Sequence, residues 1–233
     1  MNSKIDVIIP TKSNFDDLFR LIKQLQTDNS VENIVIVCDG TKAFEYVGSR
    51  VSAKMKVFYV ELSIGIHKMW NVGINYLLEN GSTSRGNHIA FINDDVSLSE
   101  NAMTKVCELL QDRIDIGLVT PSWKQDIKDD FVEEMRFGGF CMCVRSELIL
   151  QWRFDESMKW WYGDNDIMSW VSYEKNMKVG ITGKAKCFGN RSYTIKNDPP
   201  PNFNNLIDND YLIYHEKWDK RIALINEKRE SPD

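Results

Sequence analysis

The sequence lacks any apolar run long enough to form a membrane-spanning helix, and it also lacks a secretory signal. Its first apolar stretch, residues 5–9, is much shorter than the apolar core of a signal peptide and stops at Pro10. We therefore expect no stable membrane insertion, and we place the protein in the cytoplasm.

An excess of basic residues is also missing. The 233 residues contain 29 Lys and Arg against 34 Asp and Glu, a net charge of -5. Proteins that bind nucleic acids or anionic membranes through their charge usually carry a basic excess. The acidic balance therefore disfavours a nucleic-acid partner, although a local basic patch stays open. The length suits one large domain or two small ones.

The cysteines are few and odd in number, which argues against a disulfide framework in a chain without a secretion signal. No spacing among them supplies the four ligands of a zinc site. We expect reduced, buried thiols at Cys38, Cys107, Cys141, Cys143 and Cys187.

What the chain does contain, up to residue 121, is an alternation of short apolar runs with segments of helical spacing. This alternation predicts an α/β fold with a mostly parallel sheet and helices on both faces. Expected strands are 5–10, 33–40, 56–62, 88–93 and 116–121. Expected helices are 14–26, 43–50, 67–80 and 99–112, with Asn14 and Ser99 as N-caps.

The pattern changes after residue 121. Residues 122–135 are polar and irregular, which suits a mobile loop and a solvated face equally. We read the chain as one domain, 1–233, in three parts: 1–121, 122–204 and a helical extension, 205–233. Further expected features are a strand running into a helix at 136–152, a helix at 164–176, a proline-rich break at 196–202 and one or two amphipathic helices at 206–228.

Polar residues follow three of the expected strands: Pro10-Thr11, Asp39-Gly40 and Asn93-Asp94-Asp95. Ligands of parallel α/β sheets gather at the carboxyl ends of the strands, so these clusters should meet at one edge. The two adjacent carboxylates would repel each other unless a cation lay beside them. Oxygen ligands at such a place suit Mg²⁺ or Mn²⁺. The alternative is an ordinary loop start, where Asn and Asp are common.

A second acidic cluster lies further along, where Asp164 and Asp166 flank Asn165. Acidic residues in a first helical turn are favourable in themselves, so helix capping is one explanation. Capping does not explain Trp160 and Trp161 just before the cluster. The two tryptophans fit a platform for a sugar ring or a base, and they fit a core position equally well.

Seven segments, taken in order, resemble a family 2 glycosyltransferase of the GT-A fold. They are 7–25, 34–40, 65–74, 91–96, 137–149, 154–167 and 211–218. The resemblance implies a GT-A-type, Rossmann-like sheet and a small C-terminal helical extension. It implies transfer of a sugar, with inversion, from a nucleoside diphosphate sugar to a hydroxyl acceptor, with Mn²⁺ or Mg²⁺ as cofactor.

The resemblance also implies roles for particular residues. Asp164 would be the catalytic base, and Asp95, then Asp94, would hold the metal. Lys68 would face the diphosphate, although a solvated helix position suits it equally. Acceptor-binding residues would be Trp160, Trp161, Gly139 and Asp166. Nucleotide-sugar-binding residues would be Pro10, Thr11, Lys12, Asp39, Gly65, Lys68, Asn71, Asn93, Asp94 and Asp95.

The sequence departs from the family pattern at three places. Asn93 and Gly163 stand where Asp and Glu are usual, and Cys187 lies near the place where some relatives have a His. The sequence therefore does not identify a third protein ligand to the metal. His215 is an outside candidate, although its position also suits the surface of a helix.

Other functions stay in view. A non-catalytic nucleotide-sugar-binding module or a transferase that modifies a base in DNA are the alternatives. A nucleotidyltransferase would need a glycine-rich loop after the first strand, and residues 10–17 contain no glycine.

Overall fold

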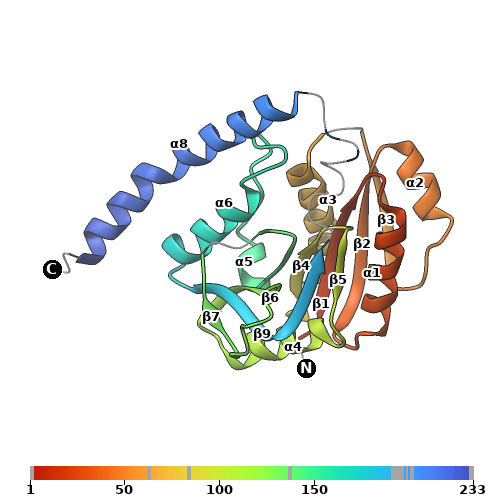
Figure 1. Cartoon of the computed structure of the whole chain (residues 1–233), viewed down its shortest axis with the longest axis horizontal. Coiled ribbons are helices and arrows are strands. Elements are labelled where there is room, and N and C mark those ends of the chain that lie inside the picture. Colours follow the sequence, from red (N-terminus) through yellow and green to blue (C-terminus); the bar gives the residue numbers. More distant parts are fainter. Residues whose placement is uncertain are drawn as a thin grey trace.

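The computed structural model describes residues 3–61, 64–82, 85–135, 138–189, 197, 199 and 202–230. Within them, nine strands form one sheet in the order β3-β2-β1-β4-β8-β6-β9-β5, and β7 pairs with β9 (Figure 1). The strands are β1 (Ile5–Thr11), β2 (Val31–Asp39), β3 (Met55–Val60), β4 (His88–Ile92), β5 (Val96–Leu98), β6 (Ile116–Ser122), β7 (Val132–Glu133), β8 (Cys141–Val144) and β9 (Lys178–Gly189).

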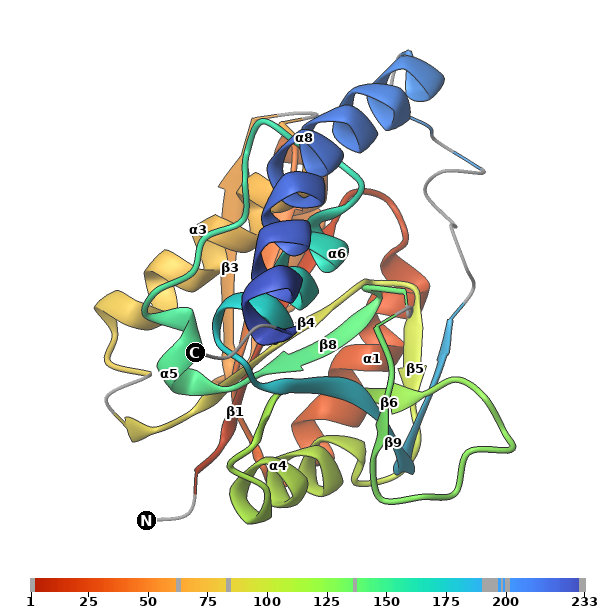
Figure 2. The same cartoon turned by 90° about the vertical axis from the view of Figure 1, so that its left-hand side faces the viewer.

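Helices cover both faces of this sheet, as expected (Figures 1 and 2). They are α1 (Phe15–Thr27), α2 (Thr41–Gly48), α3 (Ile66–Glu79), α4 (Ala102–Asp112), α5 (Ser146–Ile149), α6 (Gly163–Ser169), the π-helical turn η2 (Trp170–Glu174) and α8 (Phe203–Glu230). The buried side chains form two cores. One lies under α1, α2 and α4, and the other under α3, α5 and α6.

The pairing of the strands places the carboxyl ends of β1, β2 and β4 at one edge. β1 pairs in parallel with β2 on one side and with β4 on the other. All seven residues of β1 and all five of β4 are buried, because helices cover both of their faces. The predicted mostly parallel sheet is confirmed, with β8 inserted antiparallel between β4 and β6.

Three strands, β5, β7 and β9, were not expected because their strand signal is weak. β9 carries three glycines and three lysines among its twelve residues. It nevertheless pairs in parallel with β6. Part of the polar stretch 122–135 also joins the sheet, as the two-residue β7. The third, β5, pairs antiparallel with β9. Tertiary pairing decided all three cases.

Asn14 occupies the N-cap position of α1, as expected, whereas Ser99 does not cap α4. Asn14 precedes α1, but its side chain donates to the Asp17 carboxylate (3.1 Å) rather than accepting from the helix backbone. Helix α4 begins later than expected, after Asn101 in a left-handed conformation. The Ser99 hydroxyl instead accepts from the backbone N–H of Lys186 (3.0 Å) and holds β9 in place.

The C-terminal segment forms one continuous helix, α8, rather than two. In Figure 2 it crosses in front of α6, and in Figure 1 its C-terminal end projects from the body of the protein. Trp218 is its buried anchor. In the part of the chain that the structure describes, no helix is long and apolar enough to cross a membrane. The expected break at 196–202 falls largely outside the described residues.

Candidate active site

A cavity of about 640 Å³ opens at the carboxyl ends of β1, β2 and β4. Its floor is formed by the start of α3, including His67 and Trp70. We call one wall the strand-end side, which consists of Pro10–Lys12, Asp39 and Asn93–Asp95. A second wall is the loop side, which consists of Gly138–Phe140 and Trp160–Asn165. The two walls meet where the Asn93 N–H donates to the Phe140 carbonyl (2.9 Å). Three polar clusters predicted from the strand ends thus meet in one place.

Asp94 is held firmly on the strand-end side. The Thr11 hydroxyl donates to Asp94 Oδ2 (2.7 Å), although the two residues are 83 positions apart. The backbone N–H of Lys12 donates to the same carboxylate. Burial raises the pKa of Asp94 to about 7; the Thr11 hydrogen bond opposes this shift and the neighbouring charge of Asp95 adds to it.

The oxygen atoms of this wall fit a hard divalent cation. Asn93 Oδ1 is buried and has no hydrogen-bond partner among the described residues. With the carboxylates of Asp94 and Asp95 it makes a run of three adjacent oxygen-bearing side chains. Within the described ranges, no group of three or more His, Cys, Asp and Glu could hold a metal ion. A cation here would therefore take its other ligands from phosphate and water, as Mg²⁺ commonly does.

Asp164 lies on the loop side and is held by backbone groups. Its Oδ2 accepts from the Gly139 N–H (2.8 Å) and its Oδ1 from the Asn165 N–H (3.0 Å). A Cβ atom at Gly139 would lie 2.4 Å from the Asp164 Cβ, so only glycine permits this approach. Burial raises the pKa of Asp164, and these hydrogen bonds partly oppose the shift.

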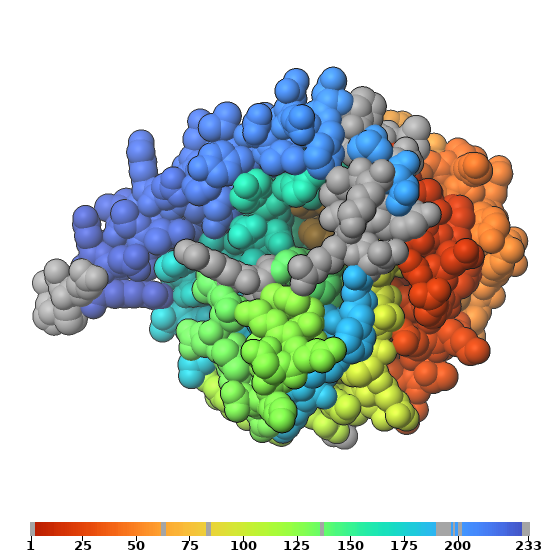
Figure 3. Space-filling model, in the orientation of Figure 1, coloured from red at the N-terminus to blue at the C-terminus, as the bar shows by residue number. Residues whose placement is uncertain are grey.

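The loop that carries Trp160 and Trp161 is fixed by the C-terminal helix. Asp210 of α8 is fully buried, and its Oδ2 accepts from the backbone N–H groups of Lys159 (3.1 Å), Trp160 (2.9 Å) and Trp161 (3.1 Å). In the space-filling view, α8 lies against the α6 region along its upper edge (Figure 3). The loop side thus depends on a helix that begins about 40 residues later.

Aromatic rings line this wall. Trp160, Trp161 and Tyr162 are half-buried and line the cavity. Trp161 meets Phe203 edge-on (centroids 4.9 Å apart), and Tyr162 stacks on Tyr214 (5.4 Å). The two tryptophans are therefore wall residues of the cavity, and their use as a sugar platform stays a prediction.

Four predicted site residues do not line the cavity. Asp166 is fully buried and binds α8 through Trp218 Nε1 (2.6 Å) and Lys217 Nζ (2.9 Å). Asn71 donates to the Phe154 carbonyl (2.8 Å) and accepts from the Phe154 N–H (2.9 Å). Both side chains therefore use their polar atoms in hydrogen bonds within the protein. The other two are Gly65, which precedes α3 with φ of 102°, and Lys68, which is exposed.

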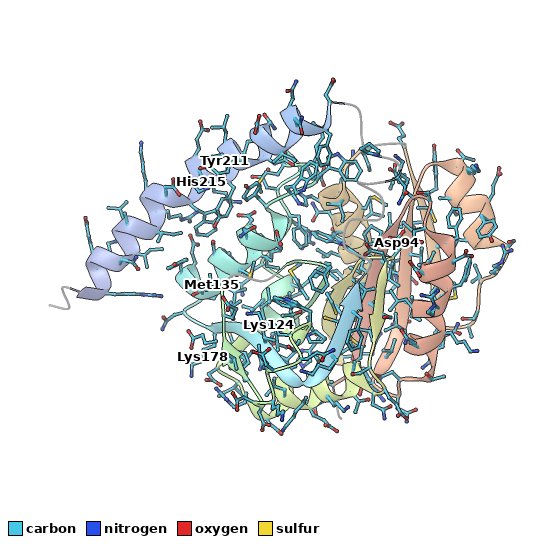
Figure 4. The ribbon with its side chains drawn as sticks, viewed as in Figure 1. Asp94, Lys124, Met135, Lys178, Tyr211 and His215 are labelled. Atoms are coloured by element: carbon cyan, nitrogen blue, oxygen red, sulfur yellow. The ribbon has the colours of Figure 1, made fainter. Side chains whose placement is uncertain are left out.

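His215, the outside candidate for a further metal ligand, does not line the cavity. His215 Nδ1 is 2.9 Å from the Asp219 carboxylate on the same helix, and its ring lies 4.1 Å from that of Tyr211 (Figure 4). Cys187 is buried and its thiol donates to the Pro121 carbonyl (3.0 Å). All five cysteines lie in the described part, and all are buried and unbridged, as expected.

Sequence reasoning missed several polar side chains of the cavity, among them Tyr162, Asn165 and His67. The most buried of these is His67. It is 1% exposed, and its ring approaches Gly163 and the base of the loop side. The local sequence around His67 does not indicate a site residue, because its contacts with Met158 and Gly163 join residues more than 90 positions apart.

Comparison with solved structures confirms the fold. The chain is similar to a crystal structure of GalNAc-T7 with UDP, GalNAc and Mn²⁺, at a TM-score of 0.65 and 12% identity. The match covers 80% of this chain and 44% of that chain, so this chain spans less than half the length of its neighbour. At this identity the likeness shows the fold alone, which is the GT-A-like Rossmann fold.

A weaker match is a cytidylyltransferase from Leptospira borgpetersenii serovar Hardjo-bovis, at a TM-score of 0.46 and 12% identity. It covers 77% of this chain and 75% of that chain, and we draw nothing from it. No protein-family model matches the sequence, and no curated protein matches it.

Proposed function

We propose that this protein is an inverting glycosyltransferase of the family 2 type, which moves a sugar from a nucleoside diphosphate sugar to a hydroxyl acceptor. One observation carries the proposal: a single cavity has Asp94 and Asp95 on one wall and Asp164 on the other. The reaction needs separate acidic groups, one set for the metal-bound diphosphate and one for the acceptor proton. We also propose that the chain forms one domain and that the protein acts in the cytoplasm.

On the strand-end side, the nucleotide would occupy the pocket shaped by Pro10–Lys12, with Asp39 accepting hydrogen bonds from its base or ribose. Asp95, together with Asp94 and Asn93, would hold Mn²⁺ or Mg²⁺, which when bound neutralises charge on the departing diphosphate. The Thr11 and Lys12 hydrogen bonds support this role because they hold Asp94 at the cavity wall.

On the loop side, Asp164 would take the proton from the acceptor hydroxyl. As that proton moves to the carboxylate, the hydroxyl oxygen forms a bond to the anomeric carbon and the bond from that carbon to the diphosphate breaks. A base is most effective when its pKa lies near the working pH, so the raised pKa of Asp164 favours this role. Its two backbone hydrogen bonds hold it in one orientation.

The GalNAc-T7 structure supports the choice of substrate class, since it contains UDP and Mn²⁺ in a protein of this fold. The identity of that protein's sugar is not transferred to this chain. We leave Asp166, Asn71, Gly65 and Lys68 out of the site, because none of them lines the cavity.

A panel of nucleoside diphosphate sugars with Mn²⁺ or Mg²⁺ tests the proposal through release of free nucleoside diphosphate. We expect metal-dependent release from at least one donor, lost on adding a chelator and strongly reduced by Asp95→Ala. Saturable donor binding without release, even with hydroxyl acceptors present, would instead identify a non-catalytic nucleotide-sugar-binding module. If the protein neither binds any donor nor releases nucleoside diphosphate from it, the proposal is refuted.

A further inference from the structure

Tyr162 has an unusual backbone conformation at the wall of the cavity. It lines the cavity and directly precedes α6, and its φ of 63° and ψ of 0° lie in the left-handed region. This region is strained for a bulky residue, because the Cβ atom comes close to the following carbonyl oxygen. The three other non-glycine residues with positive φ in the described part of the chain are all asparagines, which tolerate it. A strained residue persists only where its surroundings fix it, so the contacts of Tyr162 are informative.

The chain is held on both sides of Tyr162. The Trp161 N–H donates to Asp210 Oδ2 of α8 (3.1 Å). Gly163 packs so closely on His67 of α3 that an added Cβ atom would lie 2.2 Å from the ring. The Tyr162 carbonyl accepts from the Asp166 N–H (2.8 Å) at the start of α6. The turn from the loop into α6 is therefore made at Tyr162, between two fixed neighbours.

The side chain of Tyr162 packs on α8. Its ring stacks on that of Tyr214, with centroids 5.4 Å apart and planes 23° apart, and it meets Tyr211 edge-on (5.8 Å). The Tyr214 hydroxyl lies 2.9 Å from the hydroxyl of Ser169, the last residue of α6. Tyr214 thus contacts both the entry and the end of the short helix that carries Asp164.

The position of Asp164 depends on this turn. Asp164 lies two residues after Tyr162, and its carboxylate accepts from the N–H groups of Gly139 and Asn165. The approach to Gly139 is close enough that an added Cβ atom there would lie 2.4 Å from the Asp164 Cβ. A small shift at the start of α6 would therefore break the bond to Gly139 or force the two residues together.

We propose that Tyr162 is a positioning residue for Asp164: its ring, stacked on α8, maintains the left-handed turn that directs Asp164 to the cavity. This inference rests on the proposed function and adds to it a residue whose effect on turnover passes through Asp164. The contacts of the ring offset the strain of the backbone. A glycine would adopt the turn without strain, but it would not hold the chain in it.

Three substitutions at Tyr162 separate the ring, the strain and the hydroxyl. Tyr162→Phe keeps the ring and the strain and removes the hydroxyl. Tyr162→Ala removes the ring and keeps the strain, because Ala also disfavours positive φ. Tyr162→Gly removes both the ring and the strain, so it should melt at a higher temperature than Tyr162→Ala.

Tyr46→Ala is the matched control for the loss of an aromatic contact. Its ring on α2 stacks on Phe15 (4.4 Å) and does not line the cavity. This variant should melt at a lower temperature than wild type and keep the wild-type kcat.

The readouts are thermal melting, kcat for metal-dependent release of nucleoside diphosphate, and donor Kd by calorimetry with Mn²⁺. Tyr162→Ala and Tyr162→Gly should each lose about tenfold to 10²-fold of kcat, since a shift of about 1 Å at a catalytic group costs about 10² in rate. Their donor Kd should stay within a few-fold of wild type. Tyr162→Phe should keep most of the wild-type kcat.

The outcomes separate the two proposals. A merely structural role predicts that kcat follows the melting temperature, with Tyr162→Gly more active than Tyr162→Ala. That result, an unchanged kcat in both variants, or a matching loss of donor binding would overturn the role of Tyr162 and leave the proposed function intact. An equal loss of kcat in Tyr162→Phe would assign the effect to the hydroxyl and also overturn this role. A wild type that releases no nucleoside diphosphate from any donor would overturn both proposals.

Discussion

The two walls of the cavity are built in different ways. The strand-end side consists of residues at or just after the carboxyl ends of neighbouring parallel strands, and its main hydrogen bond joins Thr11 to Asp94 across the β1–β4 pair. The loop side is held by long-range contacts from elsewhere, such as Asp210 of α8 to the 159–161 backbone. Sheet topology therefore suffices for one wall, whereas the other needs the C-terminal helix.

The carboxylates of the two walls differ in the same way. Asp94 takes its hydrogen bonds from Thr11 and Lys12 at the end of an adjacent strand. Asp164 takes one from Gly139, which lies 25 positions earlier, and one from its own neighbour. Burial raises the pKa of both.

The roles proposed for the two walls predict different effects of substitution. A change on the loop side should act mainly on turnover, and a change on the strand-end side mainly on donor binding.

The strongest way to test this division is Asp164→Asn. The amide oxygen can keep the bond to Gly139 but cannot take a proton, so we expect turnover to fall by about 10² to 10⁴. Donor binding, measured by calorimetry with Mn²⁺, should stay within a few-fold of wild type. A parallel loss of donor binding would show that the walls are not separate.

Gly139→Ala perturbs the loop side indirectly, through the position of Asp164. The added Cβ would meet the Asp164 side chain at 2.4 Å and displace it, and a shift of about 1 Å at a catalytic group costs about 10² in rate. Gly48→Ala is the matched control, because nothing lies within 4 Å of its added Cβ. Steady-state kinetics of both variants should show the loss in the first alone.

Asp210→Ala tests whether α8 holds the loop. Three backbone N–H groups would lose their acceptor, and we expect the free energy of unfolding to fall by about 2–3 kcal/mol. Turnover should fall while the donor Kd stays unchanged. Asp208→Ala, at an exposed position on the same helix, is the control for urea unfolding and kinetics. Equal effects of the two substitutions would contradict the role of Asp210.

Low pH should lower the free energy of unfolding through His88 in the sheet rather than through the loop side. His88, at the start of β4, is 3% exposed, and burial, aided by the charge of Arg145, lowers its pKa to about 4. The unfolded chain, with a pKa near ~6.5, binds this proton first. The contribution is therefore complete above about pH 6.5 and is lost as the pH falls towards 4.

At pH 5 the loss amounts to about 2 kcal/mol. Urea unfolding at pH 7.5 and pH 5 measures it. His88→Asn, which keeps an acceptor for the Ser146 N–H, should show a smaller change with pH than wild type. An unaltered pH dependence in His88→Asn would rule out this account.

Thr11→Val should have the smallest effect. It removes the hydroxyl that donates to Asp94 but keeps the shape, which typically costs about 0.5–1.5 kcal/mol. We expect Mn²⁺-dependent donor binding to weaken by several-fold with little change in kcat. Thr41→Val, at the exposed start of α2, is the control. A large loss of kcat would place Thr11 in the chemical step instead.

Local patterns were informative where one periodicity dominated. The buried runs of β1, β2 and β4 and the helical spacing of α1, α3 and α4 were read from the sequence, and with them the edge at which Asp39, Asp94 and Asp95 meet. The signal failed at β9, whose glycines and lysines give no strand pattern, and at the start of α4, where Asn101 rather than Ser99 precedes the helix.

The sequence by itself determined the parallel sheet and the strand-end side, because strand order and the direction of a parallel strand fix where the polar residues after it must lie. Only the tertiary structure decided which of the two loop aspartates faces the cavity. Asp164 does, while Asp166 is taken by Trp218 and Lys217. It also brought His67 to Gly163. These contacts join residues 51 to 96 positions apart, and neither side of such a contact carries a local pattern that names its partner.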